Sequence, residues 1–366
     1  MPTIHVTSAS GPYNIYCQRG ALARAATLVA GLRDSTGTFL VSSPRVWRHW
    51  GRPVARIFGK PARDAILFDD AEAAKRIATV EGVARQLVRA GADRRAVIVA
   101  IGGGVVGDVA GFAAATYLRG VCLMHIPTTL VAQVDSAIGG KTGVDLPEGK
   151  NLVGAFYPPK FVVADPETLA TLPHREFRAG LYEVIKYGVI ADEKLFVFLE
   201  RHMDTILRRD PAALAYIIPR SAAIKARVVG ADEREDGLRQ ILNFGHTLGH
   251  ALETATGYKR FLHGEAVGWG MIGATLLAVA TGQLSEASAV RVVRLIASVG
   301  PLPSIAKIRA ADLRPILASD KKARGGRIRW VLPQRIGSTR WGVEVPWPVV
   351  ARAFAALPAI AAKASQ

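Results

Sequence analysis

The sequence predicts two domains, an α/β domain over residues 1–172 and an all-α domain over residues 173–366. The chain has 366 residues, of which 50% are hydrophobic, and this exceeds what a single core of typical size needs. In the first half, short β-branched runs alternate with longer segments of helical period, whereas helical patterns follow one another from about Thr171. Alternation of the first kind is typical of βα units around a mostly parallel sheet.

The strands expected in the first domain are short and rich in Val and Ile. Two glycine-dense stretches, IGGGVVGD and AIGGKTGVDLPEGKN, come where a strand or helix ends, so we expect turns in which a ligand can bind. The expected strands are TFLVSS at 38–43, DAILFDD at 64–70, AVIVAIGGG at 96–104, VCLMHIPTT at 121–129 and KFVVADP at 160–166.

The second domain is expected to consist of successive helices and a terminal hairpin. Asp210 with Pro211, and Ser285, are the residue types found at helix N-caps and first turns. The stretch IRWVLPQRIGSTRWGVEV at 328–345 predicts a hairpin before a last helix. The expected helices cover 176–190, 193–209, 211–232, the segment around His246, 264–282 and 285–300.

Several features of the composition predict a cytoplasmic protein without a membrane anchor. No stretch reaches the roughly 18 uncharged apolar residues of a membrane span. The N-terminus MPTIHVTSAS lacks the basic region and apolar run of a secretory signal. Cys17 and Cys122 lie far apart without metal-site spacing, as expected for thiols in a reducing compartment.

The formal net charge of +17 is compatible with a nucleic acid or with an anionic small molecule as partner. The basic residues are scattered, with no basic arm and no motif of a nucleic-acid-binding fold. An anionic substrate needs fewer assumptions, because a positive cleft raises the local concentration of anions. We therefore expect a small anionic substrate, no nucleic acid and no membrane.

The segment AVIVAIGGGVVGDVAGF reads as a buried strand, a glycine turn and a helix. Gly102, Gly104 and Gly107 match G-x-G-x-x-G, in which backbone N–H groups approach a pyrophosphate at a helix N-terminus. A tight turn without a ligand is an equally good interpretation, since no acid follows about twenty residues later. A ribose partner would then come from elsewhere, and FDDAEAAK offers Asp70, Glu72 and Lys75.

The stretch that follows the fourth expected strand is the most unusual in the chain. Thr128 and Thr129 end that strand, so their hydroxyls would face a crevice at its carboxyl end. GKTG resembles part of a P-loop, but the G-x-x-x-x-G-K-[ST] spacing fails, which removes most of the support for ATP chemistry. Further polar residues in or beside the glycine-rich turns can reach a ligand, namely Asp135, Lys141, Lys150 and Asn151.

Three of the eight histidines, His246, His250 and His263, fall within eighteen residues. His246 and His250 are four apart, which places both rings on one face of a helix. Such residues are either core histidines or metal ligands, and a catalytic zinc takes three protein ligands. Glu183 is a further candidate, because its apolar neighbours predict a partly buried acid that needs a cation, and Lys186 lies one turn away. All four ligands together would leave no position for substrate.

Eight motifs, in order over roughly residues 65–325, resemble those of 3-dehydroquinate synthases. The resemblance implies an NAD-binding α/β domain and a helical domain, with a divalent metal ion, zinc or cobalt, in the cleft between them. It also implies a homodimer that converts 3-deoxy-D-arabino-heptulosonate 7-phosphate to 3-dehydroquinate and phosphate in the shikimate pathway. The motifs are GGGVVGD, PTTL, QVDSAIGGKTGVD, GKNLVGAFYPP, AGLYEVIKYG, LNFGHTLGHA, HGEAV and DKK.

The resemblance also implies which residues bind the cofactors. The family's metal ligands fall on Glu183, His246 and His263, which leaves His250 off the metal and one coordination position open for substrate. Asp135, Lys141, Lys150 and Asn151 match loop residues between nucleotide and substrate. The family's NAD contacts fall on Asp70, Glu72, Lys75, Gly104, Val105, Val106, Gly107, Asp108, Thr128, Thr129, Thr168, Leu169 and Thr171.

For the substrate, the resemblance implies two anion sites. Lys141, Asn151 and His250 match residues that hold the leaving phosphate, together with Arg119 of the partner subunit. The remaining matches concern the carboxylate end, where a bidentate guanidinium suits a planar anion. Arg239 and Lys225 match the pair of residues that holds the substrate carboxylate. Asn243 and Lys321 match further residues of the same substrate site. Lys186 is a catalytic candidate to which no specific role is assigned.

Three other functions remain open from the sequence. Another sugar-phosphate cyclase, such as an aminodehydroquinate or 2-deoxy-scyllo-inosose synthase, would share most of the motifs. A metal-dependent polyol dehydrogenase would share the two-domain plan but produce NADH, whereas the cyclase reaction returns its hydride. A basic nucleic-acid-binding protein would explain the net charge but none of the motifs.

Overall fold

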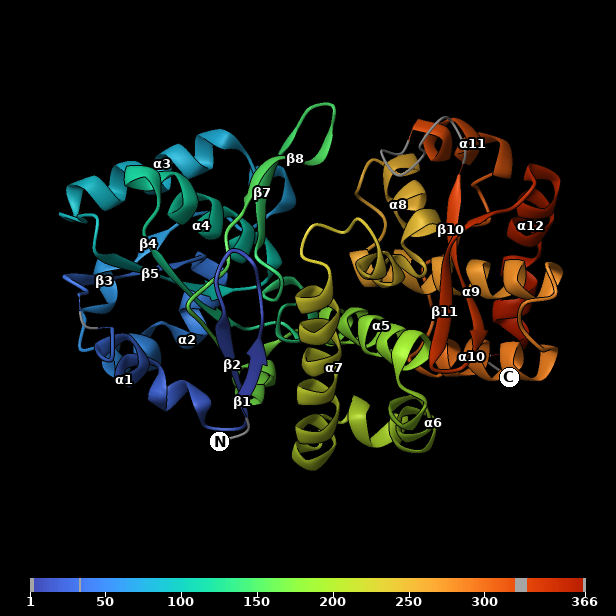
Figure 1. Ribbon diagram of the computed structural model, residues 1–366, viewed down its shortest axis with the longest axis horizontal. Coiled ribbons are helices and arrows are strands. Elements are labelled where there is room, and N and C mark those ends of the chain that lie inside the picture. Colours follow the sequence, from blue (N-terminus) through green and yellow to red (C-terminus); the bar gives the residue numbers. More distant parts are fainter. Residues whose placement is uncertain (1–2, 33, 320–327, 365–366) are drawn as a thin grey trace. The chain divides into compact units, whose positions relative to one another are not determined.

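A seven-stranded sheet is the centre of the first unit in the computed structural model, which describes residues 3–32, 34–319 and 328–364 (Figure 1). The strand order is β1-β2-β9-β6-β5-β3-β4, and every neighbouring pair is parallel except β1 and β2. The strands are β1 (Thr3–Val6), β2 (Tyr13–Cys17), β3 (Gly37–Ser42), β4 (Ile66–Leu67), β5 (Ala96–Gly102), β6 (Cys122–Pro127) and β9 (Phe161–Ala164).

The predicted α/β class and its five strands are confirmed, while β1 and β2 were not predicted. β5 is buried along its whole length because helices cover both faces of the sheet. Val97, Val99 and Ile101 pack into one hydrophobic core, and Ile98 and Ala100 into the other. The covering helices are α1 (Ala25–Ala30), α2 (Pro44–Ile57), α3 (Ile77–Arg89) and α4 (Gly104–Thr116).

The glycine-rich stretch after β6 is a β-hairpin, and this corrects the expectation of turns. β7 (Lys141–Leu146) and β8 (Gly149–Phe156) pair in antiparallel fashion. A Cβ on Gly154 would lie 2.0 Å from the Thr142 carbonyl oxygen, so the glycine allows the two backbones to approach closely. The three candidate residues Lys141, Lys150 and Asn151 therefore lie on strands and not in loops.

The second unit is helical apart from one hairpin, as predicted. Both predicted caps are present, since Asp210 Oδ1 accepts from Ala213 N at 2.9 Å and Ser285 Oγ accepts from Ser288 N at 3.3 Å. Its elements are α5 (His174–Ala191), α6 (Glu193–Leu207), α8 (His246–Ala255), α9 (His263–Ala280), α10 (Glu286–Ser298), α11 (Ala310–Ser319), β10 (Arg329–Arg335), β11 (Ser338–Glu344) and α12 (Trp347–Ala364).

The expected division lies at residue 172, whereas the compact units of the structure divide after residue 173 and again around residues 214–233. The first unit comprises residues 1–173 and 214–233, so it includes most of α7 (Pro211–Ala231). The reason lies in the partners of α7 and of the residues that follow it. Lys225 Nζ donates to the Asp135 carbonyl and carboxylate oxygens at 2.7 Å, and Glu233 Oε2 accepts from Ser10 N at 3.1 Å.

Two further expectations concern membranes and thiols. Within the residues that the structure describes, no helix combines the length and apolar composition required to cross a bilayer. Cys17 on β2 and Cys122 on β6 are both thiols, as expected. Burial raises the pKa of Cys17 to about 12, so this thiol stays protonated at neutral pH.

Candidate active site

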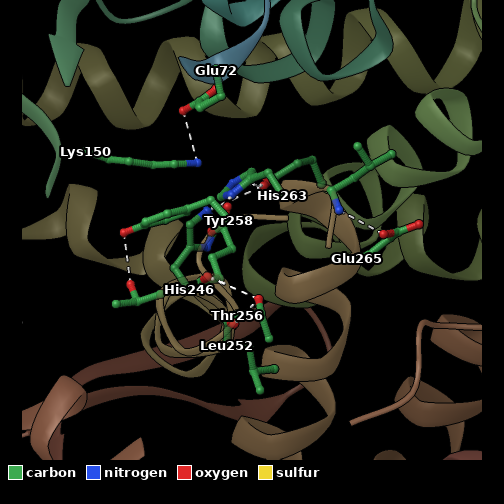
Figure 2. A network of polar contacts seen from close by, with 12 residues as sticks. Glu72, Lys150, His246, Leu252, Thr256, Tyr258, His263 and Glu265 are labelled. Carbon is green, nitrogen blue, oxygen red and sulfur yellow. Dashed lines mark hydrogen bonds and ion pairs between the residues drawn. The ribbon is translucent and has the colours of Figure 1, made fainter. Parts of the chain in front are cut away.

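Three potential metal ligands converge within the second unit. Glu183 comes from α5, His246 from the first position of α8 and His263 from the first position of α9. Glu183 Oε1 lies 3.4 Å from His246 Nε2 and 3.4 Å from His263 Nε2. The two imidazole rings lie 5.2 Å apart between centroids (Figure 2). One carboxylate oxygen therefore faces two ring nitrogens.

This spacing fits a metal ion. Ligand atoms about 2.1 Å from a tetrahedral zinc ion are separated from each other by about 3.4 Å. Glu183 is fully buried, and among the described residues neither carboxylate oxygen has a partner with hydrogen-bond geometry. A buried carboxylate normally needs such partners, and a cation bound between the three groups would satisfy it.

The hydrogen-bond partners of the Nδ1 atoms of His246 and His263 also support a metal ion at their Nε2 atoms. His246 Nδ1 lies 3.1 Å from the Phe244 carbonyl oxygen, and His263 Nδ1 lies 3.3 Å from Glu253 Oε2. Both oxygens accept hydrogen bonds, so each Nδ1 can keep its proton while Nε2 binds a metal ion. Burial opposes a charge on His263, but Glu183 and Glu253 raise its pKa to about 10, so a metal ion at Nε2 would displace a proton from this ring. Burial outweighs the attraction of Glu183 and lowers the pKa of His246, which keeps that ring neutral and able to bind a metal.

Lys186 is the cation that the sequence predicted beside Glu183. Its Nζ lies 2.5 Å from Glu183 Oε2, and its side chain is 1% exposed. Burial would raise the pKa of Glu183, but Lys186 and His246 hold it well below its ordinary value. The carboxylate is therefore ionised, with one oxygen toward Lys186 and the other toward the histidines. Because both side chains are buried, Glu183 and Lys186 are not a solvated ion pair on the helix surface.

His250 offers a second possible ligand set. One nitrogen from each of His246, His250 and His263 can be chosen so that all three lie within 4.8 Å of one another. The His250 ring centroid lies 5.4 Å from that of His246 and 5.8 Å from that of His263. We favour the set with Glu183, because its two 3.4 Å separations match tetrahedral coordination and its carboxylate lacks hydrogen bonds.

Close helix packing brings these ligands together. A Cβ on Gly264 would lie 1.9 Å from the Ala179 carbonyl oxygen, and one on Gly270 would lie 1.8 Å from that of Gly245. Only glycine lets α9 approach α5 and the start of α8 this closely. The first turn of α9 is also fixed by a side chain, since Glu265 Oε2 accepts from Leu262 N at 2.9 Å (Figure 2).

Gly270→Ala is expected to destabilise the second unit by about 1–3 kcal/mol, because a methyl group would force two backbones apart. Urea denaturation measured by circular dichroism gives the change. Gly82→Ala on α3 is the matched control, since its methyl group would meet no atom within 4 Å. The control should be neutral or stabilising by about 0.5–1 kcal/mol. Equal stability of Gly270→Ala and the wild type would contradict this view of the packing.

In the first unit, Lys75 joins several predicted cofactor residues. Its Nζ lies 2.6 Å from Asp108 Oδ2 and also donates to Asn151 Oδ1, and it is 4% exposed. Lys150 Nζ forms an ion pair with Glu72 Oε1 at 3.0 Å (Figure 2). The hairpin β7–β8 is thus tied to the segment after β4 and to the helix that follows the glycine turn.

The glycine turn itself joins β5 to α4, as the motif predicts. Thr128 N donates to the Gly102 carbonyl oxygen at 2.9 Å, which sets the two strand ends side by side. A Cβ on Gly103 would lie 2.9 Å from the Thr129 methyl carbon. Near Gly104, the hydroxyl of Ser136 is buried without a hydrogen-bond partner among the described residues. Such a hydroxyl beside a helix N-terminus fits a phosphate-bearing cofactor.

Residues near the end of β9 are held by Gln133, which the sequence did not indicate. Its Nε2 donates to the Pro127 and Asp165 carbonyl oxygens at 3.2 and 2.8 Å and to Thr168 Oγ1 at 2.9 Å. Leu169 is fully buried, and Thr171 Oγ1 accepts from Trp50 Nε1 at 2.9 Å. The Gln133 side chain therefore fixes the backbone at Asp165 and the Thr168 side chain, which lies 35 residues later in the sequence.

The other predicted cofactor residues lie on α4, after β4 and after β6. Val105 and Val106 lie in the first turn of α4 together with Gly107. Asp70 Oδ2 accepts from Arg45 Nη2 at 3.0 Å. Asp135 is paired with Lys225, as described above.

The predicted substrate residues belong to both units. Lys141 is exposed, and Arg119 has a φ of 68°, within the left-handed region. In the second unit, Arg239 is 2% exposed and Asn243 Nδ2 donates to Glu235 Oε1 at 2.5 Å. Lys321 lies outside the described residues.

Two acids of the second unit, Glu235 and Glu253, were not predicted as site residues from the sequence. Glu253 could have been found from helix periodicity, because it lies three residues after His250 and seven after His246. Glu235 lies in an irregular segment with a φ of 66°, where no periodicity identifies a neighbour. Its partner Asn243 is known only from the structure.

The α/β unit with its glycine turn and the helical unit with its ligand cluster define a two-domain enzyme that depends on a nucleotide and a metal. Family models described as the N-terminal and C-terminal parts of 3-dehydroquinate synthase match residues 65–179 and 180–323. The chain belongs to the 3-dehydroquinate synthase family.

Relatives cover almost the whole chain. It is 45% identical to a 3-dehydroquinate synthase of Solibacter usitatus, over 94% of this chain and 97% of that protein. It is 47% identical to one of Azotobacter vinelandii, over 92% of each.

Solved structures of related cyclases share the fold. The structure of 2-epi-5-epi-valiolone synthase from Streptomyces hygroscopicus, with NAD⁺ and Zn²⁺ bound, has a TM-score of 0.85 at 30% identity. The alignment covers 95% of this chain and 97% of that one. A 2-deoxy-scyllo-inosose synthase with carbaglucose-6-phosphate, NAD⁺ and Co²⁺ has a TM-score of 0.84 at 27% identity, covering 96% and 99%. A glycerol dehydrogenase of Schizosaccharomyces pombe, at 14% identity and a TM-score of 0.67, shares the fold alone.

Proposed function

We propose that this chain is a carbon–oxygen lyase that converts 3-deoxy-D-arabino-heptulosonate 7-phosphate to 3-dehydroquinate and phosphate, with NAD and a divalent metal ion as cofactors. The convergence of Glu183, His246 and His263 carries this proposal, in a chain whose relatives over nine tenths of its length are 3-dehydroquinate synthases. The assignment to the shikimate pathway follows from that substrate and product.

We propose that the three converging groups hold zinc or cobalt and leave one position for substrate oxygens. The ion would supply Lewis acidity at a substrate oxygen, while NAD would accept a hydride and later return it. Lys186 neutralises the oxygen of Glu183 that faces away from the histidines and so keeps the carboxylate charged in a buried place. Because the hydride returns, no net oxidation is expected.

We propose that the glycine turn and the residues around it bind NAD. The N-terminus of α4 would receive the pyrophosphate, with Gly104 through Asp108 closest to it. Lys75, fixed by Asp108 and Asn151, places one positive charge in that network. The other proposed NAD residues are Asp70, Glu72, Thr128, Thr129, Asp135, Lys141, Lys150, Thr168, Leu169 and Thr171.

We propose two anion-binding groups for the substrate. Lys141, Asn151 and His250 would hold the phosphate as it leaves, together with Arg119 of the partner subunit in a homodimer. Arg239 and Lys225 would hold the carboxylate, with Asn243 and Lys321 at the same substrate. The scattered positive charge of the chain supports an anionic substrate in a cytoplasmic enzyme.

A second candidate is another sugar-phosphate cyclase, which the solved structures of valiolone and deoxy-inosose synthases favour. Arg239 and Lys225 match the residues that hold the substrate carboxylate in the family, and this favours a substrate that carries a carboxylate. The substrate of an aminodehydroquinate synthase also carries a carboxylate. Only an assay with both substrates distinguishes that enzyme from a 3-dehydroquinate synthase.

Phosphate release from the heptulosonate phosphate tests the proposal. The purified protein should release phosphate, form dehydroquinate and accumulate no NADH. A chelator should abolish this, and added Zn²⁺ or Co²⁺ should restore it. Steady production of NADH would point to a polyol dehydrogenase. Release of phosphate only from the amino analogue would point to the other cyclase, and activity that persists after complete metal removal would refute the mechanism.

A further inference from the structure

Glu253 is a buried acid beside the ligand cluster, and the proposed function gives it no role. It lies near the end of α8 and is 4% exposed. Its Oε2 lies 3.3 Å from Nδ1 of His263, which is the ring nitrogen that does not face Glu183. The acid therefore contacts a proposed metal ligand on the side away from the metal.

The two histidines differ in the acceptor behind them. His246 Nδ1 has a backbone carbonyl oxygen, that of Phe244, which is neutral and belongs to a residue two positions away. His263 Nδ1 has a carboxylate from another helix. A charged acceptor strengthens the hydrogen bond and makes the opposite nitrogen more basic, which improves it as a metal ligand.

His263 has particular need of such a partner. Its side chain is 38% exposed, whereas that of His246 is 10% exposed, so surrounding atoms restrict the His263 ring less. It also occupies the first position of α9, where the N-cap is Leu262 and the preceding residues are irregular. A hydrogen bond at Nδ1 fixes both the tautomer and the direction of Nε2.

We propose that Glu253 is a positioning residue of the metal centre, which holds His263 in the orientation that presents Nε2 to the ion and strengthens that ligand. The inference rests on the proposed ligand set of Glu183, His246 and His263. Glu253 acts through His263, so its removal changes metal affinity before it changes any step of the reaction. A merely structural contact between α8 and the start of α9 would change stability and leave metal affinity unaltered.

The test compares Glu253→Ala and Glu253→Gln by the dissociation constant for Zn²⁺ alone, measured by competition with a chromophoric chelator and without substrate. Glu253→Ala should weaken Zn²⁺ binding about 10- to 100-fold. Glu253→Gln should have a smaller effect, since its amide oxygen still accepts from Nδ1. The visible spectrum of the Co²⁺ form should shift in the alanine variant and return toward the wild type in the glutamine variant.

Glu200→Gln on α6 is the matched control, because it removes one carboxylate of the same unit that is paired with Arg291. It should leave Zn²⁺ affinity unchanged. Circular dichroism and urea denaturation of every variant show whether it is folded, and the glutamine variant, which keeps the shape of the side chain, decides the matter if the alanine variant unfolds.

Wild-type Zn²⁺ affinity in folded Glu253→Ala would overturn the inference and leave the proposed function standing. When the alanine variant does not fold, wild-type Zn²⁺ affinity together with an unshifted Co²⁺ spectrum in Glu253→Gln would do the same, because a neutral acceptor should weaken the ligand. If Zn²⁺ binding depends on Glu253 but the protein releases no phosphate, the inference stands and the proposed function is overturned. A wild type that binds no Zn²⁺ would overturn both.

Discussion

His246→Ala and His263→Ala are each expected to lose the divalent metal, whereas His250→Ala is expected to keep it at one ion per chain. Removal of a direct ligand should weaken binding by more than the roughly 10- to 100-fold that loss of an outer partner causes. His250→Ala should instead lower kcat/KM by about 10- to 100-fold, since a hydrogen bond to a charged group contributes about 1.5–3 kcal/mol. Metal content after dialysis and the rate of phosphate release measure the two effects.

His49→Ala is the control, because this residue lies exposed on α2 in the first unit. It should change neither metal content nor rate. A His250→Ala protein that purifies without metal, yet remains folded, would show that the three-histidine set is the correct one. Glu183 would then have to balance Lys186 alone.

Arg239→Ala is expected to lower kcat/KM by roughly 30- to 5000-fold, which corresponds to the loss of about 2–5 kcal/mol from a buried charge that binds an anion. Arg239→Lys should restore little, because an ammonium group cannot form the two parallel hydrogen bonds of a guanidinium with a carboxylate. Steady-state kinetics with the heptulosonate phosphate give these values. Metal content should stay at the wild-type level.

Arg94→Ala is a control for the change in charge, since Arg94 is exposed in the first unit. A substrate analogue without the carboxylate makes the test specific. The wild type should turn it over poorly, and Arg239→Ala should turn it over no worse than the wild type. An equal loss on both substrates would mean that Arg239 supports the fold of its segment and does not recognise the carboxylate.

The fold class and many element positions could be predicted because they depend on local pattern. β5 is a continuous apolar run followed by glycines, and it became a central strand with a turn at its end. Asp210 and Ser285 cap helices through hydrogen bonds that span only three residues. The hairpin β7–β8 was missed because glycines that permit close strand pairing have the same composition as glycines in a turn.

The candidate metal site could be predicted only in part. The residue types and the spacing of His246 and His250 indicated a cluster, but spacing alone allowed either three histidines or a set with Glu183. Only the resemblance to a known family separated them. The structure adds a physical argument for the second set, in the 3.4 Å separations and in Glu183 Oε1, which faces both histidines and accepts no hydrogen bond from a described residue.

By itself, the sequence determined which side chains are available for metal and anion chemistry and which segments become helices and strands. Only the tertiary structure decided which oxygen stands behind each ring nitrogen, as with Glu253 and His263, and that residues 214–233 pack with the first unit. Capping and periodicity act over a few residues and leave a trace in the sequence. Packing of α9 against α5 and α8 depends on backbone approach at Gly264 and Gly270, which no local pattern records.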